Sequence, residues 1–237
     1  MIILTSDTDW VPDEILNYFL DIVDEYKAKI TIFATHKLDG RDHEIGLHPN
    51  LETTYDKVKY QRYTSLQETV KLKKVFNSAI GTRSHGLNVC TDMLLYLPIL
   101  GIRYDSSYLM SFQDNIHPYT IYPGVTEMPI HWMDIEILRF GKSLKFNNEI
   151  LKEQQKSNSI YVYDFHPSHV FTNTSSLDFY YNIYKPHYSD VGFLEGLRDK
   201  KNFGTEDALI QLLEAIDSSK LTTMSEVCMD FEKNSKH

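Results

Sequence analysis

Two carboxylates stand one residue apart just after the first apolar run of the chain. The segment "TSDTDW" at residues 5–10 follows the run at residues 2–4 and contains Asp7 and Asp9. In an extended strand these side chains project to the same face with Cα atoms roughly 6–7 Å apart, which suits a shared site. The alternative is a turn in which Asp9, Pro12 and Asp13 open the next helix.

Further polar residues lie at or just past the ends of other apolar segments. They are His36, His48, Arg83, His85, Tyr104, Asp105, His131, Asp134, His166 and His169. Carboxylates and imidazoles form a ligand set for Zn²⁺ or another divalent transition ion, and three protein ligands leave one position open. Such an ion lowers the pKa of a water molecule bound to it to about 7, and a second carboxylate can accept the proton that this water loses. Asp7 suits that task if Asp9 holds the ion.

Alternating strands and helices are predicted to position these residues. We expect strands at 2–4, 29–34, 44–47, 79–82, 102–104, 126–132 and 159–165, and helices at 13–27, 65–77, 91–99, 147–156 and 205–217. Continuous apolar strands indicate a parallel sheet covered on both faces. We therefore predict an α/β fold, a distorted or partial (β/α) barrel, in which the carboxyl ends of the strands meet on the catalytic face.

Length and composition restrict the function classes. The 237 residues, with 42% hydrophobic and 13% aromatic residues, fit a single globular domain over 1–237. A formal net charge of −9 argues against nucleic acid as the partner. Residues 172–204 have no clean period, which is typical of a functional or mobile connection.

The N-terminus and the cysteines bear on location. Residues 1–10 carry no basic segment followed by a long apolar run, and no membrane-spanning run occurs, so we expect a cytoplasmic protein without a transmembrane segment. The two cysteines, Cys90 and Cys228, are expected to be reduced structural thiols, although the sequence leaves a disulfide between them open.

Six segments carry most of these polar residues in a fixed order. They are "TSDTDW" (5–10), "DHEIGLHPN" (42–50), "GTRSHG" (81–86), "IRYDSSY" (102–108), "MPIHWMD" (128–134) and "YDFHPSH" (163–169). Their order and rough spacing over residues 1 to about 170 resemble the motifs of the polysaccharide deacetylases, which share the NodB-homology or carbohydrate esterase family 4 fold. The resemblance is greater to the divergent WbmS-like branch, associated with lipopolysaccharide O-antigen biosynthesis.

The resemblance implies roles for individual residues. Asp7 would be the general base, Asp9 and His48 metal ligands, His166 the general acid, and Arg83 and Asp134 would orient and tune the base and the acid. The family's second metal histidine should lie four residues after His48, where this chain has Glu52. Either Glu52 ligates, or His85 takes its place, or the site is lost or completed by water. His85 is our preferred candidate because it follows a strand that we expect to neighbour the strand before His48. Zinc is the expected ion, with Co, Ni, Mn and Fe as alternatives.

The expected reaction is metal-dependent hydrolysis of an N-acetyl or related acyl group on a carbohydrate, in surface polysaccharide or lipopolysaccharide biosynthesis. Two rival functions stay open. One is another metal-dependent barrel hydrolase, although such enzymes usually carry His-x-His on the first strand. The other is an inactive deacetylase-like domain that binds glycan or a partner protein, for which Glu52 is the best support. The oligomeric state is left open.

Overall fold

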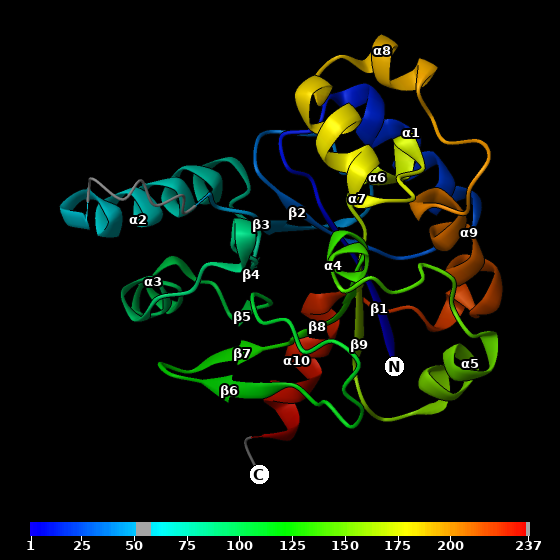
Figure 1. Ribbon diagram of the computed structural model, residues 1–237. Helices are drawn as coiled ribbons and strands as arrows, with labels where there is room; N and C mark the ends of the chain where they lie inside the picture. The colour runs from blue at the N-terminus through cyan, green and yellow to red at the C-terminus, as the bar shows by residue number, and fades with distance from the viewer. Residues whose placement is uncertain (51–57, 236–237) are drawn as a thin grey trace.

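A curled mixed sheet forms a half-barrel at the centre of the molecule (Figure 1). The computed structural model describes residues 1–50 and 58–235, with side chains throughout except at 58–65. Within these ranges the sheet has the strand order β6-β7-β5-β4-β3-β2-β1-β9-β8, and only the β6–β7 pair is antiparallel. The strands are β1 (Ile2–Asp7), β2 (Thr31–Ala34), β3 (Glu44–Leu47), β4 (Gly81–Thr82), β5 (Tyr104–Asp105), β6 (Tyr119–Ile121), β7 (Val125–Glu127), β8 (Ile130–Met133) and β9 (Tyr161–Asp164).

Helices cover both faces of this sheet. They are α1 (Asp13–Glu25), α2 (Val58–Val75), α3 (Thr91–Tyr96), α4 (Asp134–Arg139), α5 (Asn148–Lys156), α6 (Pro167–Thr172), α7 (Leu177–Phe179), α8 (Val191–Gly196), α9 (Thr205–Ala215) and α10 (Met224–Asn234). Short turns of other helix types include η1 (His85–Leu87), η3 (Tyr180–Tyr184) and η4 (Lys185–His187). No helix among the described residues is long and apolar enough to cross a lipid bilayer.

The strand β1 shows why the sequences of the central strands are continuous apolar runs. Ile2 and Leu4 pack in a cluster with residues of α1 and α9, whereas Ile3 packs in a second cluster with residues of α10. Because side chains alternate along a strand, helices on both faces bury every position. The expected α/β partial barrel is confirmed, and the central strands end where the candidate site residues begin.

The predicted strand at 126–132 is wrong as a single element. It is two strands, β7 and β8, which pair with β5 and β9 near opposite ends of the sheet order. Pro129 lies between them, and a proline cannot donate the hydrogen bond that a continuous central strand requires. The backbone of Ile130 bridges to Leu109 beyond β5, so this segment brings the two sides of the half-barrel together. This is why residues of both sides share one rim.

Other differences concern the later part of the chain. The helix α10 was not expected, and the aperiodic 172–204 segment contains α7, η3, η4 and α8. These short helices lie beside α4 and α6 at the carboxyl ends of the strands (Figure 1). Both cysteines are free thiols, Cys90 exposed and Cys228 buried.

Candidate active site

The two carboxylates of the first motif meet at one imidazole, although the backbone between them is not extended. Asp7 ends β1, and Asp9 and Trp10 then adopt left-handed conformations with φ of 44° and 56°. The extended geometry expected for both carboxylates is therefore wrong, because the chain turns at Asp9. The turn is anchored by the Trp10 amide, which donates to the Thr35 hydroxyl oxygen at 2.9 Å. A left-handed non-glycine residue is unfavourable and typical of functional sites.

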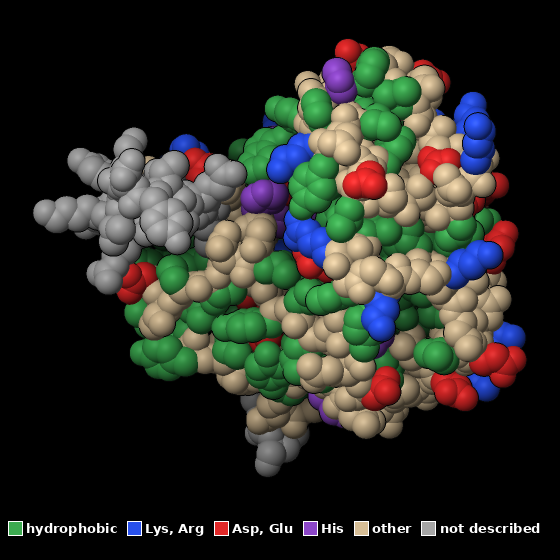
Figure 2. Space-filling view, in the orientation of Figure 1, with side chains coloured by type: hydrophobic (Ala, Val, Ile, Leu, Met, Phe, Trp, Pro, Cys, Tyr) green, Lys and Arg blue, Asp and Glu red, His purple; other side chains and the backbone are tan. Residues whose placement is uncertain are grey.

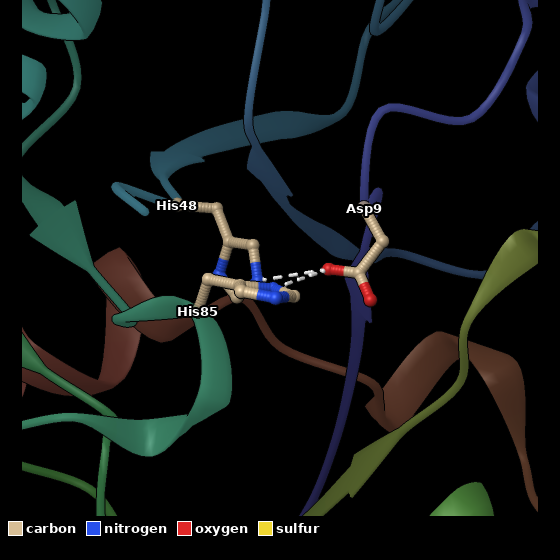
Figure 3. A group of neighbouring side chains, drawn as sticks. All are labelled: Asp9, His48 and His85. Carbon is tan, nitrogen blue, oxygen red and sulfur yellow. Dashed lines mark hydrogen bonds and ion pairs between the residues drawn. The ribbon is translucent and has the colours of Figure 1, made fainter. Parts of the chain in front are cut away.

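Asp9, His48 and His85 form a compact cluster from three segments far apart in the sequence (Figure 3). His48 follows β3, and His85 begins η1 after β4. One oxygen of Asp9, Oδ1, lies 3.2 Å from His48 Nε2 and 2.9 Å from His85 Nδ1. The Asp9 and His85 side chains are 29% and 28% exposed, whereas that of His48 is 1% exposed. The cluster is open on one side and enclosed on the other.

The hydrogen bonds of His48 orient its ring for this cluster. Its Nδ1–H donates to the Arg83 carbonyl oxygen at 2.7 Å, which leaves Nε2 directed at Asp9. A backbone acceptor behind a histidine is the usual support of a metal-binding imidazole. Burial lowers the pKa of His48, but the neighbouring carboxylates of Asp7 and Asp9 outweigh it and raise this pKa. Burial raises the pKa of Asp9, and its bonds to His48 and His85 outweigh this and hold the pKa well below its usual range.

Arg83 lies fully buried beneath the cluster. Its Nη1 contacts Asp7 Oδ1 at 2.9 Å and also the Asp164 carboxylate, while its guanidinium packs 4.3 Å from the centre of the Phe33 ring. The other nitrogens donate to the Ser106 carbonyl and hydroxyl oxygens at 3.0 and 2.9 Å. Asp7 Oδ2 remains directed at His48, with 3.8 Å between it and Nε2. Arg83 therefore fixes one oxygen of Asp7 and leaves the other facing the cluster.

His166 is held by Asp134 at the beginning of α4. Its Nδ1–H donates to Asp134 Oδ1 at 2.7 Å, and its backbone N–H donates to Oδ2 at 2.8 Å. The other ring nitrogen, Nε2, lies 3.7 Å from Asp9 Oδ2. Burial lowers the pKa of His166, but Asp134 and then Asp9 and Asp164 outweigh it and raise this pKa well above the usual value. Asp134 therefore favours the protonated form of the His166 imidazole, whose Nε2 faces Asp9.

His169 has the opposite character. The Thr172 hydroxyl donates to the Ser168 carbonyl at 2.8 Å, so the Thr174 hydroxyl, 2.9 Å from Thr172 Oγ1, must donate to Thr172. His169 Nδ1 lies 3.0 Å from Thr174 Oγ1 and must then carry the proton, which leaves a lone pair on Nε2. Burial lowers the pKa of His169 to about 4. In the "YDFHPSH" motif, His166 therefore offers Nε2–H as a donor, whereas His169 offers the lone pair of Nε2 as an acceptor.

Three groups of described residues bring metal-ligating atoms together, and one fits an ion best. In the group of Asp7, Asp164 and His166, both carboxylates already contact the Arg83 guanidinium, whose charge repels a cation. In the group of Asp134, His166 and His169, both Asp134 oxygens accept hydrogen bonds from His166. In the group of Asp9, His48 and His85, the Asp9 carboxylate pairs only with imidazoles among the described residues, and these nitrogen and oxygen donors suit a divalent transition ion.

Comparison with known proteins decides the family. The model of the WbmS-like polysaccharide deacetylases matches residues 4–184, which include every residue of the cluster. The chain belongs to this family. None of the curated proteins matches the chain.

Solved structures agree with this family fold. WbmS of Bordetella bronchiseptica, assigned to O-antigen biosynthesis as a polysaccharide deacetylase, is 23% identical, with a TM-score of 0.74 over 90% of this chain and 89% of that one. A 4-α-glucanotransferase from Thermococcus litoralis is 16% identical, with a TM-score of 0.54 over 97% of this chain and 38% of that one. Identities this low show a shared fold and do not by themselves show a shared activity.

The expected site residues of this deacetylase family member are brought together at one rim. Asp7, Asp9, His48, His85 and His166 all line one pocket of about 280 Å³. Arg83 and Asp134 lie behind them and contact Asp7 and His166. Glu52, the alternative third ligand, lies outside the described residues.

Sequence reasoning missed part of the pocket. Glu136, Arg139, Tyr180 and Lys185 also line it, from α4, η3 and η4. The polar residues of α4 follow the "MPIHWMD" motif directly, so their position after a strand was a usable signal. Tyr180 and Lys185 lie in the aperiodic segment, where only the density of aromatic residues indicated a role.

Proposed function

We propose that this protein removes an N-acetyl or related acyl group from an amino sugar, with a divalent ion held by Asp9, His48 and His85. The observation that carries the proposal is the convergence of these three side chains beside Asp7 and His166, in a member of a deacetylase family. By similarity to WbmS, we infer that the sugar is a precursor or part of a surface polysaccharide.

Zinc is the ion that this ligand set suits best, because one carboxylate and two imidazoles match three-ligand catalytic zinc sites. Co, Ni, Mn and Fe accept the same ligands. When bound, such an ion supplies positive charge that acidifies water and stabilises negative charge on the amide oxygen. The exposed side of Asp9 and His85 leaves room for a substrate.

Asp7 is the proposed general base. Arg83 Nη1 donates to its Oδ1 at 2.9 Å and fixes the orientation of the carboxylate. Its Oδ2 faces His48 at 3.8 Å and is available to accept a proton from water in the pocket. The side chain is almost completely buried, so few competing waters reach it.

His166 is the proposed general acid. Asp134 accepts its Nδ1–H, which fixes the ring and favours the protonated imidazole, so Nε2–H can donate to the leaving nitrogen. Asp7 and His166 flank Asp9 from β1 and from the segment after β9. One ligand atom of Asp7 and one of His166 lie within 4.8 Å of each other, so the base and the acid can act on the same bound group.

A metal analysis combined with an acetate-release assay tests the proposal. We expect a stoichiometric divalent ion in protein purified without chelator and loss of that ion in His48→Ala. His43→Ala is the matched control, because His43 pairs with Asp24 on the surface of α1 and should leave the metal content unchanged. Retention of the ion in His48→Ala would remove His48 from the ligand set. A protein that binds glycan without an ion would favour the inactive binding domain.

The base assignment has its own variant. Asp7→Asn should lower kcat by at least about 100-fold, because the amide cannot accept the proton. The metal content should persist, since Asp7 is not a proposed ligand. Asp13→Asn, at the beginning of α1, is the matched control. Near wild-type turnover in Asp7→Asn would show that another group acts as the base.

A further inference from the structure

Two positively charged side chains lie at the mouth of the catalytic pocket. Arg139 is in the last turn of α4, and Lys185 begins η4. Both line the same pocket as the proposed metal ligands. Figure 2 shows Lys and Arg side chains beside a histidine in the region between β3 and α4. The chain has a net charge of −9, so a local excess of positive charge at one pocket needs a structural or functional explanation.

Lys185 has no carboxylate partner within the described part of the chain. Its side chain is exposed, and its recorded contact is with the Tyr181 ring, 5.6 Å from Nζ to the ring centre. A cation–π contact orients an ammonium group without neutralising it. The charge of Lys185 is therefore available to a ligand in the pocket.

Arg139 is only partly neutralised. Its Nη1 pairs with Glu136 one turn earlier in α4, and its side chain is 45% exposed. An exposed pair of this kind contributes about 1 kcal/mol or less to stability, so it does not by itself account for the position of the arginine. A guanidinium has five N–H donors in a planar fork that matches carboxylate and phosphate oxygens. The donors that Glu136 does not use can bind such oxygens.

One aromatic side chain connects both cations. Tyr181 lies close enough to the Arg139 guanidinium to affect its pKa, and its ring also contacts Lys185. The preceding residue, Tyr180, lines the pocket, with its ring 5.7 Å from that of Tyr184 and nearly parallel to it. The Tyr180 ring, supported from behind by the buried Tyr184 ring, gives the pocket an aromatic wall suited to the face of a sugar.

We propose that Arg139 and Lys185 bind an anionic group of the substrate, a carboxylate or a phosphate, so that the acylated sugar on which the protein acts is an acidic one. This inference rests on the proposed deacetylase function and adds the substrate class. The pocket of about 280 Å³ is near the lower end of the range for small-molecule pockets, about 300–1,000 Å³, which suits a single charged sugar unit.

Matched substrates test the inference. We would compare N-acetylglucosamine, its uronic acid form and its 1-phosphate, and measure kcat/KM from acetate release for each. Wild type should prefer one of the charged sugars to the neutral one. In Lys185→Ala and in Arg139→Gln, the charged-to-neutral ratio should fall about tenfold, chiefly through KM, because each variant loses a charge-assisted hydrogen bond. Comparison of the uronic acid with the 1-phosphate shows whether the bound anion is a carboxylate or a phosphate.

A matched control and a binding measurement complete the test. Lys152→Ala removes the same charge from exposed α5 and should leave the ratio unchanged. Titration calorimetry with the same three sugars on metal-loaded wild type and Lys185→Ala gives a readout that does not need turnover. If the variant binds only the charged sugars more weakly, the result supports anion binding by Arg139 and Lys185, whether or not acetate is released. Absence of acetate release would count only against the deacetylase function. Equal loss for charged and neutral sugars, or no loss, would overturn the inference.

Discussion

Two pairs of buried carboxylates lie at the carboxyl ends of the strands, and they are neutralised differently. Asp7 and Asp164 end β1 and β9 and both contact the Arg83 guanidinium. Asp105 and Glu127 end β5 and β7 and are register partners. Among the described residues, no Lys or Arg lies within salt-bridge distance of that second pair.

We expect the second pair to hold a proton, whereas the first pair contacts a guanidinium cation. Asp105 Oδ2 and Glu127 Oε2 are both buried, and neither has a hydrogen-bond partner among the described atoms. Two carboxylates can share a hydrogen bond only if one of them is protonated. Burial, followed by the neighbouring Asp105 charge, raises the pKa of Glu127 far above its usual value. We therefore expect Asp105 and Glu127 to share a proton, whereas Asp7 and Asp164 share the Arg83 guanidinium.

Replacing Arg83 should have the largest effect, because both carboxylates of the first pair depend on its charge. Methionine in Arg83→Met replaces the unbranched aliphatic part of the arginine side chain but not its charge. The variant therefore leaves Asp7 and Asp164 buried without a cation. We expect the free energy of unfolding to fall by about 3–5 kcal/mol, the usual cost of removing one partner of a buried ion pair. Urea unfolding followed by circular dichroism measures this loss.

A surface arginine provides the control for that variant. Arg41→Met removes an exposed partner of Asp21 and Asp24 on α1 and should cost about 1 kcal/mol or less. If Arg83→Met were no less stable than Arg41→Met, the carboxylates at the catalytic rim would not depend on the guanidinium.

Much of the fold followed from the sequence because its elements have clear periods. The strands at 29–34 and 44–47 and the helix at 205–217 were predicted within a few residues of β2, β3 and α9. The break between β7 and β8 was missed, because an apolar run does not reveal that its two halves pair with distant strands. Pro129 was the available signal.

The site was predictable where residues follow strands and unpredictable where contacts are long-range. His85 was expected beside His48 because their strands were predicted to be neighbours, and β3 does pair with β4. The left-handed turn at Asp9 was missed, since backbone conformation after a strand depends on anchors such as Thr35. The pairing of Asp105 with Glu127 depends on the register of two strands 20 residues apart, which no local pattern encodes.

The shared proton should make stability depend on pH. The unfolded chain releases the Glu127 proton near pH 4.3, whereas the folded protein retains it to far higher pH. The stabilisation is therefore fully present below about pH 4.3 and is lost as pH rises toward the raised pKa. In Glu127→Gln the amide donates to Asp105 at every pH. We expect the variant to lose about 1 kcal/mol less per pH unit than wild type between pH 5 and 8, measured by urea unfolding. Parallel profiles would show that the pair does not share a proton.

Asp164 should give a smaller and narrower effect of the same sign, because Arg83 compensates only part of its burial. Burial and then the Asp7 charge raise the pKa of Asp164 to about 6, and its Oδ2 has no hydrogen-bond partner among the described atoms. Its protonation stabilises the folded state fully below about pH 3.9, and this contribution is lost by the time the pH has risen through about 6. Asp164→Asn should therefore flatten the stability profile below about pH 6 and leave its slope above pH 7 unchanged. A change of slope above pH 7 would show that the guanidinium leaves a shared proton in this pair too, and the two carboxylate pairs would then differ only in degree.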